Sequence, residues 1–135
     1  MPENREAILE SIRRVLLQET SVVFAYLFGS FVKEPAFRDL DIGVYLRPGA
    51  DPLFTLSDVR MKLSRATGMA ADIFDLHLIN EVLEKGDLHA LLVLGRIIET
   101  GILMVDKDFD LRADFIDRYS LKHRENEVLF DEVLL

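Results

Sequence analysis

Apolar residues near the start of the chain recur every three or four positions: Ile8, Leu9, Ile12, Val15 and Leu16. This spacing places them on one side of a helix, so it predicts an amphipathic helix over residues 3–18 with one buried stripe. Residues 21–28 then form a continuous β-branched and aromatic run that ends at Gly29. Such a run is typical of a buried strand that stops at a turn.

The pattern changes at residues 39–46, where polar and apolar positions alternate before the run becomes apolar and meets an Arg-Pro-Gly sequence. We interpret this segment as a second strand. Asp51 followed by Pro52 is a typical helix start, and Gly68 is a typical helix stop. The buried side of the helix between them is marked by four apolar residues, Leu53, Leu56, Val59 and Leu63.

The rest of the chain predicts five further elements in alternation. They are a strand over 71–79, a short helical turn over 80–84, a helix opened by Asp87 and closed by Gly101, an edge strand over 102–105, and a long helix over about 108–132 that breaks near Ser120. This order predicts an α+β fold, in which a small mixed β-sheet carries flanking helices. We find no repeat or linker and expect a single domain over residues 1–135.

Composition and charge narrow the range of functions. The net charge of −8 and the pI of about 4.8 argue against a general nucleic-acid binder, because such proteins neutralise many phosphates with Lys and Arg. The chain has no cysteine, which excludes disulfides and thiolate metal sites. A charged N-terminus and the lack of a long apolar run predict a soluble cytoplasmic protein without a signal peptide or membrane span.

The second predicted strand contains two carboxylates, Asp39 and Asp41, that point to the same face. Two ionised carboxylates this close repel each other unless a cation lies between them. Oxygen ligands without a nearby His or Cys favour Mg²⁺ or Mn²⁺ over Zn²⁺. Because Mg²⁺ completes its octahedron with water and phosphate oxygens, the pair indicates a substrate that carries phosphate.

The turn after the first strand offers hydrogen-bond donors that can bind an anion. Gly29 allows a close backbone approach, and Ser30 supplies a hydroxyl and nearby N–H groups to an anion. If the two strands are neighbours, this turn and the aspartate pair converge on one phosphate group. Each feature alone is more often structural than functional, but their combination in this order reverses those odds.

A third carboxylate is available on the third predicted strand. Asp72 and Asp75 are three residues apart, so only one of them can face the aspartate pair in a regular strand. We assign Asp72, because it opens the strand near a rim, and place Asp75 on the outer face. Such an acid could accept the proton of an acceptor hydroxyl and hold a second metal ion.

The sequence signals for other kinds of functional site are weaker. The three histidines, His77, His89 and His123, lie on separate elements without ligand spacing, so surface or half-buried roles are favoured over metal binding. A Walker phosphate-binding loop and a hydrolase nucleophile elbow are both absent from the sequence. Tyr119 and its charged neighbours are interpreted as a solvated helix face, with a partner-facing helix as the alternative.

These residues resemble the minimal nucleotidyltransferase (MNT) branch of the nucleotidyltransferase superfamily related to DNA polymerase β. That branch has Gly-Ser after a strand, Asp-x-Asp on the next strand and a further Asp on a later one. The matching positions here are Gly29, Ser30, Asp39, Asp41 and Asp72. The segment 78–108 is also similar to the corresponding region of MNT antitoxins, so the resemblance covers most of the chain and implies a polymerase β-like fold.

The resemblance implies a reaction as well. An MNT enzyme transfers a nucleoside monophosphate, here expected to be AMP, from ATP or another NTP to a hydroxyl with one or two Mg²⁺ ions. By resemblance, Asp39, Asp41 and Asp72 would be the catalytic and metal-binding residues, and Gly29 and Ser30 would bind the nucleotide. The implied role is that of an antitoxin that adenylylates a tyrosine of a cognate HEPN ribonuclease toxin. Direct DNA binding and membrane association are not expected, and homo- and hetero-oligomers both stay open.

The sequence departs from the family in the loop before Asp39, which is about two residues shorter than the common pattern. Val32, Lys33 and Glu34 replace the usual Ala-Arg-Gly, and Arg38 stands where a small hydroxyl residue is frequent. Lys33 or Arg38 could supply the basic contact to the triphosphate. Two alternatives therefore stay open: an impaired protein that neutralises its partner by binding alone, and, less favoured at this length, an enzyme that modifies a small molecule.

Overall fold

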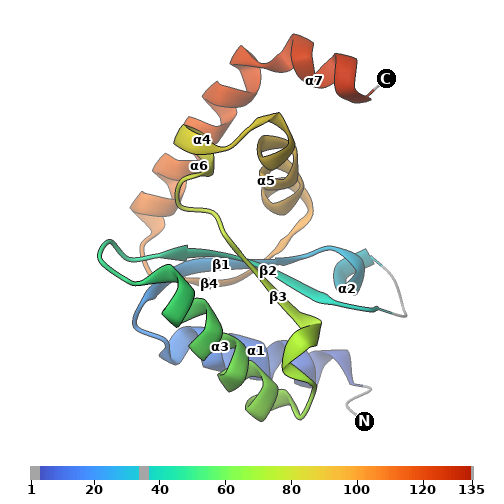
Figure 1. Cartoon of the computed structure of the whole chain (residues 1–135), viewed down its shortest axis with the longest axis vertical. Helices are drawn as coiled ribbons and strands as arrows, with labels where there is room; N and C mark the ends of the chain where they lie inside the picture. Colours follow the sequence, from blue (N-terminus) through green and yellow to red (C-terminus); the bar gives the residue numbers. More distant parts are fainter. Residues whose placement is uncertain (1–3, 34–36, 135) are drawn as a thin grey trace.

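A mixed β-sheet forms the centre of the protein, and the computed structural model describes it within residues 4–33 and 37–134 (Figure 1). In these residues the sheet has four strands in the order β3-β2-β1-β4. Their bounds are β1 Val22–Phe28, β2 Leu40–Leu46, β3 Phe74–Leu78 and β4 Ile102–Asp106. β1 pairs antiparallel with β2 and β4, whereas β2 and β3 are parallel. The predicted small mixed sheet is confirmed.

Helices cover both faces of this sheet. Below it in Figure 1 lie α1 (Arg5–Gln18) and α3 (Pro52–Thr67), and above it lie α5 (Leu88–Thr100) and α6 (Phe109–Glu125). The remaining helices are shorter: α2 (Ser30–Lys33) follows β1, α4 (Val82–Lys85) follows β3, and α7 (Glu127–Leu134) ends the described chain. The fold is therefore α+β with flanking helices, as predicted.

Alternation along the strands divides the core into two clusters. Leu40, Ile42 and Val44 of β2 pack with α1 and α3 in one cluster. The alternate residues of β2 point to the other face. Among them, Tyr45 packs against the cluster under α5 and α6. A Cβ on Gly43 would lie 3.2 Å from Ile97, so α5 passes directly over this part of the strand. Asp41 consequently belongs to the face that carries α5.

Local sequence signals explain where the main helices begin and end. The Asp51 carboxylate accepts hydrogen bonds from the N–H groups of Leu53 and Phe54, and the side chain of Asp87 accepts one from Ala90. Gly68 ends α3 in the left-handed conformation at a φ of 75°. Each such N-cap typically contributes about 1 kcal/mol of stability, and all three predicted signals are confirmed.

The two largest differences from the predicted boundaries are at residues 71–73 and in the tail helix. Residues 71–73 form a 3₁₀ turn, named η1 (Ala71–Ile73), because the N–H of Ile73 bonds back to the carbonyl of Ala70 instead of entering the sheet. The tail helix breaks at Asn126 and not near Ser120. There the N–H of Asn126 bonds to the carbonyls of Lys122 and His123, and its side-chain amide donates to Lys122 as well.

Among the described residues, each helix is too short or too polar to cross a membrane.

Candidate functional site

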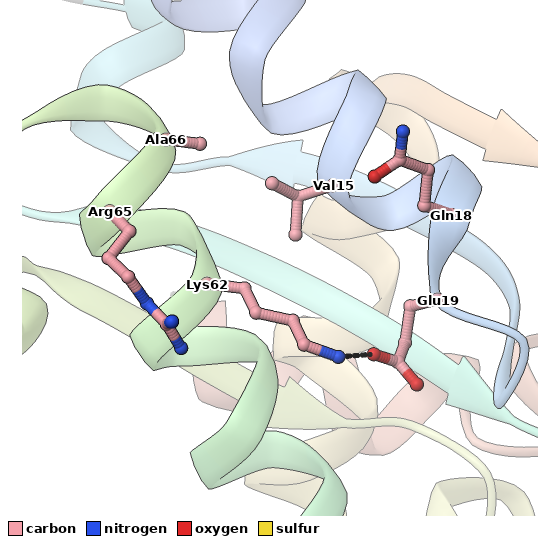
Figure 2. Close-up of a pocket in the computed structure, with 6 residues that line it drawn as sticks. All are labelled: Val15, Gln18, Glu19, Lys62, Arg65 and Ala66. Atoms are coloured by element: carbon pink, nitrogen blue, oxygen red, sulfur yellow. Dashed lines mark hydrogen bonds and ion pairs between the residues drawn. The ribbon is translucent and has the colours of Figure 1, made fainter.

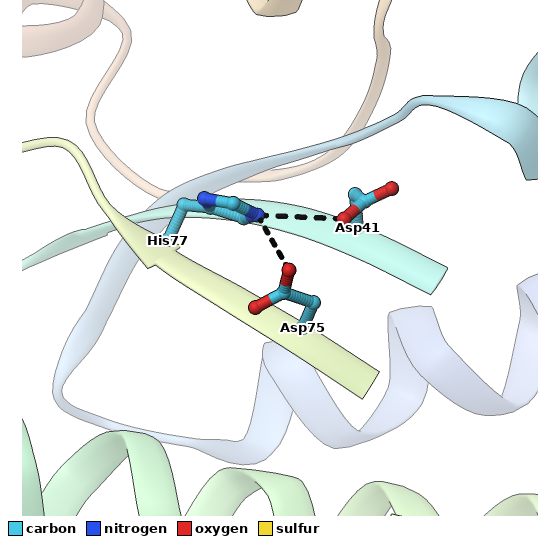
Figure 3. Close-up of side chains that lie close together, drawn as sticks. All are labelled: Asp41, Asp75 and His77. Atoms are coloured by element: carbon cyan, nitrogen blue, oxygen red, sulfur yellow. Dashed lines mark hydrogen bonds and ion pairs between the residues drawn. The ribbon is translucent and has the colours of Figure 1, made fainter. Parts of the chain in front are cut away.

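The parallel pairing of β2 with β3 brings two carboxylates and an imidazole together at one edge of the sheet. Asp41 lies opposite Asp75, and Gly43 lies opposite His77, so all three polar side chains point to the α5 face. The His77 Nε2 atom is 3.4 Å from Asp41 Oδ1 and 3.3 Å from Asp75 Oδ2 (Figure 3). One ligand atom from each residue lies within 4.8 Å of the others. These three residues are called the Asp-Asp-His cluster below.

Gly29 lies against this cluster from the neighbouring strand. Phe28, the last residue of β1, pairs with Asp41, and Gly29 then turns the chain with a φ of 83°. A Cβ at position 29 would collide with the Oδ2 atom of Asp41. Both the left-handed backbone and the close approach therefore require glycine.

Ser30 begins α2 immediately after this turn and is half-buried. The turn is held by a 3.1 Å hydrogen bond from the N–H of Val32 to the carbonyl of Gly29. Since β1 and β2 are neighbours, the Gly-Ser turn and Asp41 lie at the same end of the sheet. The turn and Asp41 are therefore close together, and their convergence on one phosphate group stays a prediction.

The charge of the cluster is unbalanced. Partial burial raises the pKa of Asp41, and the negative charges of Asp75 and Asp39 raise it further, whereas the hydrogen bond to His77 lowers it. Asp39 itself is exposed and directly precedes β2. A cation placed among these carboxylates would offset the repulsion and favour their ionised form.

Asp72 and Asp75 lie differently from the prediction. Asp72 is exposed on η1, ahead of the strand, and is absent from the Asp-Asp-His cluster. Asp75 is on β3 in register with Asp41 and faces the same side. The prediction that Asp72 opens the strand is wrong, because the strand begins only at Phe74. The role of Asp72 as a ligand stays a prediction.

Two basic residues predicted to contact the triphosphate flank the segment before Asp39. Lys33 ends α2 and is exposed, and Arg38 lies exposed in a bend next to Asp39. Glu34, another position where the sequence departs from the family, lies outside the described residues. Both cations thus lie on the segment between the Gly-Ser turn and Asp41.

His77 and Asp75 were not identified from the sequence as site residues. The interpretation that no histidine lies near the carboxylates is wrong, because β3 places His77 between Asp41 and Asp75. The available signal was Asp-x-His at residues 75–77, which repeats the same-face spacing of Asp39 and Asp41. Two carboxylates and an imidazole are donors that fit one divalent metal ion.

Two hollows lie on different sides of the sheet. A cavity of about 290 Å³ opens beside His77 and is lined mainly by apolar residues of β3, α4 and α5, together with His89. A larger hollow of about 550 Å³ lies between α1 and α3 on the other face, where Lys62 and Glu19 form an ion pair (Figure 2). The first of these hollows reaches the Asp-Asp-His cluster through His77.

Solved structures with this fold were found among toxin-antitoxin complexes. One, described as a toxin-antitoxin with AMP-PNP, is 20% identical with a TM-score of 0.60 and covers 94% of this chain and 98% of that chain. A mutant of the toxin-antitoxin MntA-HpeT, with two aspartates replaced by glutamate, is 18% identical with a TM-score of 0.59 and the same coverage. At this identity the likeness establishes the fold alone.

Comparisons at the sequence level identify the family. A search of curated proteins gave no match. The family model described as "Polymerase beta, Nucleotidyltransferase" matches residues 10–110, which is most of the chain and includes the Gly-Ser turn, Asp39 and the Asp-Asp-His cluster. The chain therefore belongs to the polymerase beta nucleotidyltransferase family.

Proposed function

We propose that the protein transfers a nucleoside monophosphate from an NTP to a hydroxyl group in a reaction that depends on a divalent metal ion. The observation that carries this proposal is the convergence of the Gly29 turn with Asp41 and Asp75 at one edge of the sheet. Family membership supports the reaction class. ATP is the expected donor, so the transferred group would be AMP.

The residues divide into a metal-binding and a phosphate-binding set. Asp39 and Asp41 would hold the metal, with Asp75 as the third carboxylate, because it faces Asp41 in the register of β2 and β3. Gly29, Ser30, Lys33 and Arg38 would bind the triphosphate. When bound, Mg²⁺ or a similar ion neutralises the phosphate oxygens and the charge that develops on the leaving group.

The chemical step is a displacement at the α-phosphorus. The acceptor hydroxyl oxygen bonds to this phosphorus, the bond from the phosphorus to the bridging oxygen of the β-phosphate breaks, and pyrophosphate leaves. The acceptor proton would pass to the third carboxylate, for which Asp75 is our assignment. Asp75 is about half exposed, at 56% of its side chain, so an acceptor can reach it.

The acceptor we propose is a tyrosine of a HEPN ribonuclease toxin, so that the protein acts as an antitoxin. Support comes from two observations: the similar solved structures are toxin-antitoxin complexes, and one of them contains AMP-PNP. The surface charge is compatible with a basic partner, since the chain has a net charge of −8.

The test combines the purified protein with its partner toxin and each of the four nucleoside triphosphates in turn. Intact mass spectrometry of the toxin should show an increase by whole nucleoside monophosphates, largest with ATP. Peptide mapping then identifies the acceptor residue. An unchanged toxin mass with every nucleotide would contradict the proposed transfer.

A second candidate function is neutralisation by binding alone. It is favoured by the short segment between Ser30 and Asp39, where the usual family residues are replaced. A cell-survival assay with the variant Asp41→Asn separates the two functions. If transfer is the mechanism, this variant fails to protect cells from the toxin, whereas a binding antitoxin still protects them.

A further inference from the structure

We propose that His77 is a nitrogen ligand of the metal site and makes it select Mn²⁺ over Mg²⁺. The inference rests on the proposed function for the presence of a metal at the Asp-Asp-His cluster. His77 lies outside the Asp-x-Asp motif of residues 39–41.

The distances around His77 fit a shared ion better than a strong ion pair. Its Nε2 atom lies 3.4 Å from Asp41 Oδ1 and 3.3 Å from Asp75 Oδ2. A direct N–H to O hydrogen bond is typically about 2.9 Å long. Adjacent donors around an octahedral ion with bonds of about 2.1 Å lie about 3 Å apart. The two distances from Nε2 are close to this donor spacing, and ligand atoms of all three residues lie within 4.8 Å of one another.

The fold holds His77 in this position. β3 pairs with β2 in regular register on both sides of the histidine, from Leu40 opposite Phe74 to Val44 opposite Leu78. On the same face, the ring of Phe28 packs against the imidazole with a centroid distance of 5.2 Å (Figure 3 shows the imidazole facing both carboxylates). The side chain is 35% exposed, so an ion can enter from solvent.

The donor set determines which ion binds best. Mg²⁺ prefers oxygen ligands and gives up its water reluctantly, so an imidazole in its shell brings little advantage. First-row transition ions bind imidazole more strongly, and Mn²⁺ also accepts carboxylates and water. An imidazole added to the carboxylates therefore favours Mn²⁺, whereas carboxylates alone would favour Mg²⁺.

The experiment measures metal binding directly and needs neither nucleotide nor toxin. Electron paramagnetic resonance titration with Mn²⁺ alone gives its affinity, and competition gives that of Mg²⁺. We expect the wild-type protein to bind Mn²⁺ more tightly than Mg²⁺. In His77→Asn, the ratio of the Mn²⁺ affinity to the Mg²⁺ affinity should fall by about tenfold or more. His89→Asn is the matched control, because His89 is exposed, lines the same cavity and is not in the cluster.

A second readout identifies the ligand itself. Electron spin echo modulation of bound Mn²⁺ should show coupling to an imidazole nitrogen in the wild-type protein and in His89→Asn, but not in His77→Asn. Circular dichroism checks that each variant is folded, and His77→Gln replaces His77→Asn if the latter does not fold.

Three results would overturn the proposal: no bound Mn²⁺, bound Mn²⁺ without nitrogen coupling, or unchanged or tighter Mn²⁺ binding in His77→Asn. The last result would mean that His77 merely occupies the place of the ion. None of these results bears on nucleotide transfer with Mg²⁺, so the failure of this inference is distinguishable from the failure of the proposed function.

Discussion

Gly29 lies so close to Asp41 that a Cβ at position 29 would collide with the Asp41 Oδ2 atom. Asp41 is on β2, and Gly29 directly follows the antiparallel strand β1 with a φ of 83°. This contact joins the turn proposed to bind phosphate to the carboxylate proposed to bind metal. It therefore offers a way to disturb the geometry of the site without removing any of its charges.

Replacing Gly29 by alanine should displace the Asp41 carboxylate and strongly reduce both metal binding and nucleotide transfer. The control is Gly49→Ala, because Gly49 has a similar φ of 88° but nothing within 4 Å of a Cβ. Both variants should lose about 1 kcal/mol or more of stability from backbone strain. Thermal unfolding and a transfer assay check this, and equal transfer by the two variants would show that the close contact is unimportant.

The choice between Asp75 and Asp72 as third carboxylate is tested by two matched variants. Asp75→Asn should lower the rate of nucleotide transfer by about a hundredfold or more, in the range typical for loss of a general base. Asp72→Asn should lower it much less, because Asp72 is exposed on η1 and outside the cluster. The rates are compared at saturating nucleotide. The opposite order of effects would return the role to Asp72.

Arg112 should be the most important charged residue for attaching α6 to the sheet. Its guanidinium donates to Asp106 of β4 at 2.8 Å and to the Tyr26 hydroxyl of β1 at 3.0 Å. The side chains of Arg112 and Asp106 are each only 19% exposed. Arg112→Met leaves the Asp106 carboxylate without this partner, so we expect a loss of about 2 to 3 kcal/mol in urea unfolding.

The matched control for Arg112 is Arg118 on the same helix. Its partner Glu84 is 3.0 Å away, and both side chains are about half exposed, at 46% and 54%. Arg118→Met should cost less than about 1 kcal/mol. Similar losses in the two variants would mean that burial of the Arg112 pair does not strengthen it.

Lys62 should contribute to stability but not to function. Hydrogen bonds to Asp58 and Glu19 raise its pKa above the ordinary value of 10.5. The contribution is therefore fully present below pH 10.5 and is lost as the pH rises through the higher pKa of the folded protein. Because 45% of the side chain is exposed, Lys62→Met should cost less than about 1 kcal/mol, and less still at high salt.

Urea unfolding at pH 7 and above pH 11 measures the effect of Lys62, and the transfer assay serves as the functional control. The difference between wild type and Lys62→Met should shrink at the higher pH. A large loss of transfer in this folded variant would place function at the hollow between α1 and α3, against the proposed site.

The parts of the site that depend on local sequence could be predicted. The glycine at position 29 indicates a turn, and strand alternation predicts the face to which Asp41 points. The apolar runs identify both strands. The proximity of the turn and Asp41 needed only that consecutive strands be neighbours. The helix caps at Asp51 and Asp87 were predictable for the same reason, because a cap involves residues two or three positions apart.

The Asp-Asp-His cluster depends on distant pairing, which the sequence does not specify. Asp41 and His77 are brought together only by the parallel register of β2 and β3. That register depends on where β3 begins, and the 3₁₀ turn at residues 71–73 delays the start to Phe74. A strand that starts at residue 71 makes Asp72 the rim carboxylate and places Asp75 on the outer face, which is the arrangement that the sequence predicted.

The central claim is tested most directly by following the α-phosphate of ATP. Wild-type protein should transfer label from [α-³²P]ATP, but not from [γ-³²P]ATP, to the toxin in the presence of Mn²⁺ or Mg²⁺. Asp41→Asn, with the same fold by circular dichroism, should transfer none. The account would be contradicted by label on the toxin from the γ-phosphate, or by the absence of α-phosphate label with both ions. Transfer that survives in Asp41→Asn would contradict it as well.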